Sequence, residues 1–331
     1  MHKQSHKKSP SSQYIIFVAF LTLTLSACSG DAADTYELAV QGLYSADISD
    51  DGTTAVIGSI QHGGSFWGIQ KNERRFNWNH KQGEFSSLIS VDIDSSGDFA
   101  ATGSARTLVL WNALVGEPIE FWDSPGDIKS LKLSRNGDFA LLGLDDETAR
   151  YFDIKNGGVK QTFRTNSIVR AVDIDDASEL ALTGDDNSKV ILWDTNTGER
   201  KHEWTLSNRI ASVALSSDGQ YAFGAAQLGN AMIWSTETGD LVLKVDTGAL
   251  VSRNITISKA KFSANNKYLL AGEINSKVKL LSLPDGNIVK SWQANKKESL
   301  RYTGSSILAL SFGLDGKYYA MGSNGLLNIL E

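Results

Sequence analysis

Residues 168–204 read IVRAVDIDDASELALTGDDNSKVILWDTNTGERKHEW and contain four short segments in which apolar residues alternate with others. Alternation with a period of two is typical of β-strands, and the residues between the segments are those that favour tight hairpin turns. The stretch therefore predicts a unit of four antiparallel strands. Its landmarks, in chain order, are Ile174, the turn Ala177-Ser178, Gly184, Trp193, Gly198 and Trp204.

The same landmarks recur along the chain at intervals of about 40 residues. The first segments of the units end at Ile48, Ile93, Leu133, Ile174, Leu215, Phe262 and Phe312. The third segments end at Trp67, Trp111, Phe152, Trp193, Trp234, Leu281 and Ile329. Four antiparallel strands in about 40 residues make one blade of a β-propeller. The units therefore predict an all-β fold, a seven-bladed β-propeller of four-stranded antiparallel blades.

The unit at 168–204 resembles a WD-repeat, through its pairs Trp193-Asp194 and Thr197-Gly198. The resemblance covers about residues 34–331, but the Gly-His pair of that family is missing from every unit. The Trp-Asp pair occurs once, and Phe152-Asp153 is a weaker version of it. The resemblance therefore implies that the buried His–Ser/Thr–Asp–Trp network of the family is largely absent here, so that packing must hold the blades rigid.

The last unit has only three segments, because the chain ends at Glu331, two residues after Ile329. Residues 35–40, before the first unit, alternate like a strand. We expect this segment to complete the last blade as its outer strand, which closes the ring and removes an exposed hydrophobic edge.

The N-terminus resembles a bacterial lipoprotein signal. Lysines precede an apolar run from Tyr14 to Leu25, which is too short to span a membrane. The following Leu25-Ser26-Ala27-Cys28 resembles a lipobox, which implies a diacylglycerol and a further acyl chain, such as palmitate, on Cys28. The predicted organisation is a signal peptide at 1–27, a lipidated tether at 28–33 and the propeller at 34–331.

Composition and motifs argue against chemistry at a cofactor. The net charge is −6, and removal of residues 1–27 takes away three lysines and no acid, which argues against nucleic acid as a partner. A single cysteine excludes a disulfide framework and a cysteine zinc site. His62, His80 and His202 are isolated and build no nucleophilic triad. We expect no cofactor and no phosphate-binding loop.

Acidic residues in several turns resemble parts of metal or catalytic sites. Residues 92–98 read DIDSSGD, like the start of a calcium-binding loop, but Gly103 stands where a bidentate glutamate is needed. A hairpin turn explains them better. The pairs Asp145-Asp146 and Asp185-Asp186 follow the repeat and are interpreted as solvated turn residues rather than catalytic carboxylates.

Three connections between units are longer than the others, at 79–87, 246–256 and 293–306. Such loops lie on one face of a propeller, and they carry more basic than acidic residues. We expect this arc to bind an acidic protein surface or an anionic envelope glycan. The predicted binding residues are His80, Lys81, Arg253, Lys296, Lys297, Arg301 and Tyr302.

These observations predict a monomeric lipoprotein, anchored in the outer membrane through its lipid and facing the periplasm or the cell surface. Its expected function is a non-catalytic scaffold for envelope proteins. Two alternatives stay open: a periplasmic enzyme of the lactonase or hydrolase type, with its residues gathered at the central channel, and a factor for outer-membrane protein assembly.

Overall fold

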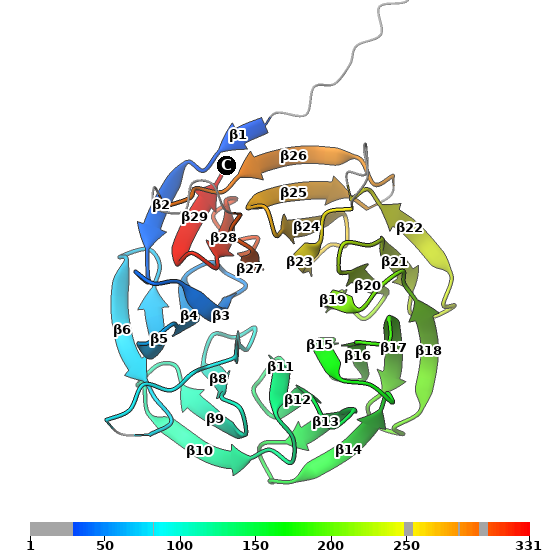
Figure 1. Cartoon of the computed structure of the whole chain (residues 1–331), viewed down its shortest axis with the longest axis horizontal. Helices are drawn as coiled ribbons and strands as arrows, with labels where there is room; N and C mark the ends of the chain where they lie inside the picture. Colours follow the sequence, from blue (N-terminus) through cyan, green and yellow to red (C-terminus); the bar gives the residue numbers. More distant parts are fainter. Residues whose placement is uncertain (1–28, 82, 248–253, 284, 298–303) are drawn as a thin grey trace, which may run out of the picture.

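The chain folds into a ring of seven β-sheets, which confirms the predicted propeller (Figure 1). The computed structural model describes residues 29–331 with the exception of 82, 248–253, 284 and 298–303. Each sheet is a blade with four antiparallel strands, and the first of them lies next to the propeller axis. Within the described residues, the chain has no helix of the length and apolar character that a membrane crossing needs.

The blades are numbered along the chain, with their strands given from the axis outward. Blade one contains β3 (Leu43–Ile48), β4 (Thr54–Ser59), β5 (Gly63–Gly68) and β6 (Glu73–Trp78). Blade two contains β7 (Ser90–Ile93), β8 (Phe99–Gly103), β9 (Thr107–Asn112) and β10 (Pro118–Asp123). Blade three contains β11 (Ile128–Leu133), β12 (Phe139–Leu144), β13 (Thr148–Asp153) and β14 (Val159–Arg164). Blade four contains β15 (Val169–Ile174), β16 (Leu180–Asp185), β17 (Lys189–Asp194) and β18 (Arg200–Thr205).

The remaining strands follow the same order. Blade five contains β19 (Ile210–Leu215), β20 (Tyr221–Ala226), β21 (Ala231–Ser235) and β22 (Leu241–Val245). Blade six contains β23 (Ile257–Phe262), β24 (Tyr268–Glu273), β25 (Lys277–Ser282) and β26 (Ile288–Gln293). Blade seven contains β27 (Ile307–Ser311), β28 (Tyr318–Gly322), β29 (Leu326–Leu330) and, from the N-terminal side, β2 (Asp34–Glu37).

Strand β2 closes the ring, as predicted, by pairing antiparallel with β29. The ladder is shorter than the predicted 35–40, because the N–H groups of Leu38 and Ala39 both donate to Gly325 O and the chain leaves the sheet there. Both side chains remain buried in the cluster between blades seven and one. Lys297 Nζ holds the segment from outside: it donates to Ala39 O at 2.6 Å and lies 2.8 Å from Glu37 Oε1.

A further strand, β1 (Ser29–Asp31), was not predicted. It pairs in parallel with β26 and makes blade six five-stranded (Figure 1). Gly30 lies opposite Trp292 in this ladder. A segment of three residues gives no periodic signal in the sequence, which is why the pattern missed it.

The hydrophobic core lies between neighbouring blades. Phe66 and Trp78 of blade one, for example, belong to one buried cluster with Val109 and Trp111 of blade two. The recurring glycine of the second strands allows this close approach. A Cβ atom at Gly184 would lie 2.4 Å from Cγ2 of Ile210, on the innermost strand of the next blade. Glycine is therefore needed at this position of the second strand so that the next blade can approach.

In blades one and four, a tryptophan on the outer strand donates a hydrogen bond to a turn of the next blade. Trp204 Nε1 donates to Gly239 O at 2.8 Å, and the Trp204 ring stacks on Trp234 with centroids 4.6 Å apart. Gly239 has a φ of 78°, and a Cβ there would lie 2.6 Å from His202 Nδ1. This turn therefore requires glycine both for its left-handed backbone and for the approach of blade four.

Part of the WD-repeat hydrogen-bond network is present, contrary to the expectation that it is largely absent. In blade two, Trp111 Nε1 donates to Thr102 Oγ1 at 2.8 Å, and His80 Nε2 lies 2.8 Å from the same oxygen. In blade four, Trp193 Nε1 donates to Thr183 Oγ1 at 2.9 Å. The sequence pattern missed the His80 contact because Asn79, not glycine, precedes this histidine.

Closure by β2 is tested with two truncations. A chain that begins at Gln41 lacks β2 and the buried Leu38, and its free energy of unfolding should fall by about 3 kcal/mol or more, from lost apolar burial and lost ladder hydrogen bonds. A chain that begins at Asp34 lacks only β1 and should lose much less. Urea unfolding measures both; equal stability of the two truncated chains would contradict closure by β2.

His80 predicts a pH dependence of stability. Burial lowers the pKa of the His80 imidazole to about 4, below the value of about 6.5 in an unfolded chain. The unfolded state therefore binds the proton more tightly, so the contribution of neutral His80 is present above pH 6.5 and is lost as the pH falls toward 4. In His80→Phe, the free energy of unfolding should fall by about 1 kcal/mol at pH 7 and lose this acid dependence. Parallel pH profiles of the two proteins would contradict the assignment.

Candidate functional site

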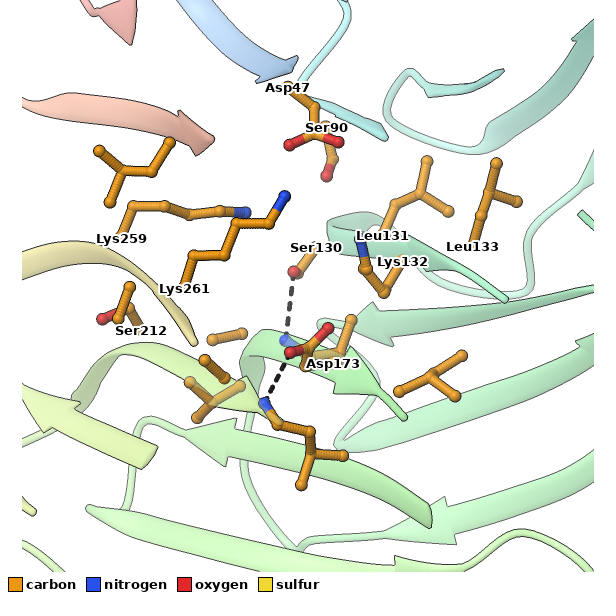
Figure 2. A pocket seen from close by; sticks show the side chains of 18 of the residues that line it. Asp47, Ser90, Ser130, Leu131, Lys132, Leu133, Asp173, Ser212, Lys259 and Lys261 are labelled. Carbon is orange, nitrogen blue, oxygen red and sulfur yellow. Dashed lines mark hydrogen bonds between the residues drawn. The ribbon is translucent and has the colours of Figure 1, made fainter. Parts of the chain in front are cut away.

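The inner strands surround a cavity of about 260 Å³ on the propeller axis (Figure 2). The innermost strand of every blade contributes lining residues: β3, β7, β11, β15, β19, β23 and β27. The cavity is rich in charged and hydroxyl side chains. It is therefore the place where the fold gathers the most polar chemistry.

Several charges at the axis come from one position, or column, of the repeat, the residue directly before the apolar landmark that ends each first strand. That column reads Asp47, Asp92, Lys132, Asp173, Ala214, Lys261 and Ser311. Our sequence reasoning missed this set because it followed the apolar positions on either side. Reading the intervening column of the aligned repeats is the signal that would have found it.

The carboxylates of this column bond the blades to one another. Each accepts a hydrogen bond from the backbone N–H of the innermost strand of the next blade. The pairs are Asp47 Oδ2 with Ile93 N at 3.1 Å, Asp92 Oδ2 with Leu133 N at 2.8 Å and Asp173 Oδ2 with Leu215 N at 2.7 Å. Blades two, three and five thus provide the donors to blades one, two and four. The last of these bonds is drawn in Figure 2. These acids have a structural role.

Lys132 compensates the buried acids. Its Nζ lies 2.9 Å from Asp92 Oδ1, and the Asp92 side chain is only 2% exposed. Burial raises the pKa of Asp92, and Lys132 acts in the opposite direction by favouring the charged carboxylate. Burial disfavours the charge on Lys132, but Asp92, Asp47 and Asp173 together raise the pKa of Lys132 well above its ordinary value. Lys132 is thus the cation that offsets the negative charge of these three buried acids.

Two further ion pairs lie where the inner strands end. Lys261 of blade six pairs with Asp50 of blade one, across blade seven. Arg135 of blade three pairs with Asp176 of blade four, Nη1 to Oδ2 at 3.3 Å. Burial favours the neutral form of Asp50, but Lys261 holds the pKa of this carboxyl below its ordinary value. This end of the channel is occupied by paired charges.

Fewer groups remain available for a ligand. Among the residues that the structure describes, the side chains of Lys259 and Ser90 make no hydrogen bond or ion pair of their own. Ser130 Oγ accepts from Val172 N at 3.3 Å and keeps its own hydrogen for donation. Figure 2 shows Lys259 extending from blade six toward the middle of the cavity. These donors suit a polar or anionic group of a bound molecule, and the part of the chain that is described brings no nucleophile and base together here.

The predicted binding arc is only partly brought together. Lys81 is exposed and pairs with Glu84 at 2.7 Å, and Lys296 is exposed. His80 turns inward to Thr102, and Lys297 holds the closing segment. Arg253, Arg301, Tyr302, Cys28 and the signal segment 1–27 lie outside the described residues. Partner binding by this arc stays a prediction.

The acidic turns bind their own backbone. Asp94 Oδ1 accepts from Phe99 N at 2.9 Å within the hairpin, whereas Asp92 faces Lys132 in the channel, so the two do not converge on one ion. Asp146 accepts from Thr148 N at 3.1 Å. Across the ranges that the structure describes, no three His, Cys, Asp or Glu side chains are grouped in a way that would hold a metal ion.

Comparison with known proteins identifies the repeat. Residues 157–194 match the family described as WD domain, G-beta repeat. Three matches are to eukaryotic translation initiation factor 3 subunit I. The protein of Candida glabrata is 29% identical over 28% of this chain and 26% of its own length. That of Coccidioides immitis is 32% identical over 28% of each, and that of Vanderwaltozyma polyspora 33% over 20% and 19%. The chain thus spans about a quarter of these relatives.

These matches correct the function expected from the N-terminal residues. They are to a subunit of a translation initiation factor and not to lipid-anchored envelope proteins. The finding overturns the prediction of a lipoprotein scaffold, its outer-membrane location, its membrane anchor and its envelope partners. It also overturns both alternatives, the periplasmic enzyme and the outer-membrane assembly factor. The expectation rested on residues 1–28, whereas the matched family covers a blade of the ring.

The fold and the matched repeat agree with each other. The matched residues 157–194 contain β14 to β17, from the outer strand of blade three to the third strand of blade four. The same four-stranded arrangement recurs in all seven sheets of the ring. The chain is therefore a WD-repeat-like β-propeller.

Proposed function

We propose that this propeller is a non-catalytic subunit of a multiprotein assembly and that it contacts a partner subunit at the channel mouth around Lys259. The relevant mouth is the one at which the inner strands begin, where Ser90, Ser130 and Lys259 line the cavity. The long connections enter the blades on the same side.

The proposal rests on the contacts that the charged side chains of the channel make. Asp47, Asp92 and Asp173 are bound to backbone N–H groups of the next blade, and Lys132 is bound to Asp92. Groups that hold the ring together are poor candidates for a reaction that must move protons, because a change in their charge would disturb the contacts between blades. Lys259 has no such commitment within the described residues, and it is suited to bind rather than to react.

The matched relatives support the subunit role. These relatives are subunits of a translation initiation factor. Because the chain spans about a quarter of their length, we infer from them only that the chain is a subunit. Experiment must identify the assembly to which it belongs. Components of the translation machinery are the first candidates to test.

The proposal is tested by native mass spectrometry of the tagged full-length chain, isolated from its own cells at its natural level. We expect a stoichiometric complex with the wild type. Lys259→Met should reduce the recovery of the partner at least tenfold, since the change removes a cavity cation that forms no ion pair or hydrogen bond within the described residues and leaves the inter-blade bonds intact.

The matched control is Lys267→Met, which removes an exposed lysine of the same blade outside the cavity. It should retain the complex. Equal unfolding temperatures of both variants show that the fold is intact. A wild type that is recovered only as a monomer would contradict the subunit role, and a complex that Lys259→Met retains in full would contradict the site.

A further inference from the structure

The outer strand of blade two, β10, exposes apolar side chains at the edge of its sheet. It pairs with β9 on one side only. Ile119 is 47% exposed and Phe121 46%, and the turn before the strand exposes Leu114 and Val115 still further. An edge strand with exposed apolar residues offers both unpaired backbone groups and hydrophobic contacts to another chain.

A groove runs beside β10 toward blade three. It has a volume of about 290 Å³, and its apolar wall contains Phe99, Leu110, Ile119, Trp122 and Ile154. The Trp122 ring meets Phe152 of blade three edge to face, with centroids 5.4 Å apart. Ile119 lies at a bulge in the β9–β10 ladder and lines this groove. Apolar side chains of a strand added to β10 would therefore find a ready-made recess.

Blade six shows that an outer strand of this ring accepts a further strand. There β1 pairs in parallel with β26 and lies opposite Ser291, Trp292 and Gln293. Trp292 occupies the same position of the repeat as Trp122 of β10. The corresponding register on blade two therefore runs along Phe121, Trp122 and Asp123.

The charge on β10 is entirely acidic. The strand and the residue before it carry Glu117, Glu120 and Asp123 and no lysine or arginine. The outer strands of the next two blades differ, since β14 carries Lys160 and Arg164 and β18 carries Arg200 and Lys201. Within the described part of the chain, none of the three acids on blade two forms an ion pair. A cationic segment would therefore meet only acidic charges on the strand itself, whereas Lys155 lies on the blade-three side of the groove.

Glu120 accepts a hydrogen bond from a backbone N–H at the edge of its own strand. The N–H of Phe121 donates to Glu120 Oε1 at 3.3 Å. A carbonyl group of an added strand would replace this long hydrogen bond with a ladder bond. The Glu120 carboxylate would then be released from the edge of the strand.

We propose that β10 binds an extended protein segment in which apolar residues alternate with lysine or arginine, as a fifth strand of blade two. The apolar side chains enter the groove beside Ile119 and Trp122, and the basic ones lie on the opposite face of the strand, beside Asp123. This inference names a second contact of the proposed scaffold and rests on that function only in requiring a protein partner.

The probe is a fluorescent nine-residue peptide that alternates valine and lysine, with both ends blocked. Comparison peptides alternate valine and glutamate, or carry a central proline that cannot continue a ladder. Fluorescence anisotropy with the purified full-length chain measures affinity, and amide hydrogen exchange maps the site. We expect the lysine peptide to bind at least tenfold more tightly than either comparison peptide and to protect the amide of Phe121.

Two charge variants separate this site from general attraction to an acidic protein. Glu120→Lys/Asp123→Lys should weaken the lysine peptide at least tenfold. Glu237→Lys/Asp240→Lys makes the same change of charge at exposed residues just before β22, the outer strand of blade five, and should stay within about twofold of the wild type.

Several results would overturn the proposal: no binding of the lysine peptide, equal binding of the proline peptide, equal weakening in both variants, or protection away from β10. Self-association of the chain that Glu120→Lys/Asp123→Lys abolishes would name a second copy as the occupant and overturn the basic partner. Because the assay uses the purified chain and a peptide, its failure leaves the test of the subunit role at Lys259 untouched.

Discussion

Contact between neighbouring blades is the constraint on which this molecule depends. A four-stranded blade has two faces, and each becomes buried only when the next blade lies against it. The sequence provides for this contact at three distances from the axis. On the innermost strand, a carboxylate can accept a hydrogen bond from an N–H of the next blade. On the second strand, glycine leaves room for side chains of the next blade, and on the fourth strand, tryptophan can donate to a turn of the next blade. The closing strand β2 completes the last contact.

The apolar landmarks and the glycines were sufficient to predict the blades, their number and the closure. They do not predict the direction in which a polar side chain turns. His80 lies in a long connection and looks like an interface residue, but its ring turns inward to Thr102. Lys297 was predicted to bind a partner, yet its Nζ bonds backbone carbonyl groups of the closing segment. Hydrophobic periodicity carries no information on which partner a polar side chain selects.

The function of a propeller channel can be inferred only when the hydrogen bonds of its charged side chains are known. Aspartates and lysines around a cavity resemble a catalytic centre when only residue types are considered. In this molecule the acids are acceptors for inter-blade N–H groups, and Lys132 offsets their burial. What remains for recognition is the uncommitted Lys259 at the axis and, on the outside of the ring, the acidic edge of β10.

A double-mutant cycle tests most directly whether the axial charges hold the ring together. Urea unfolding at pH 7 of Lys132→Met, Asp92→Asn and the double variant yields the coupling free energy of the pair. The account predicts that Lys132→Met alone is strongly destabilising, that the double variant recovers part of the loss, and that the coupling is about 1–3 kcal/mol. Effects that add within about 0.5 kcal/mol would contradict it.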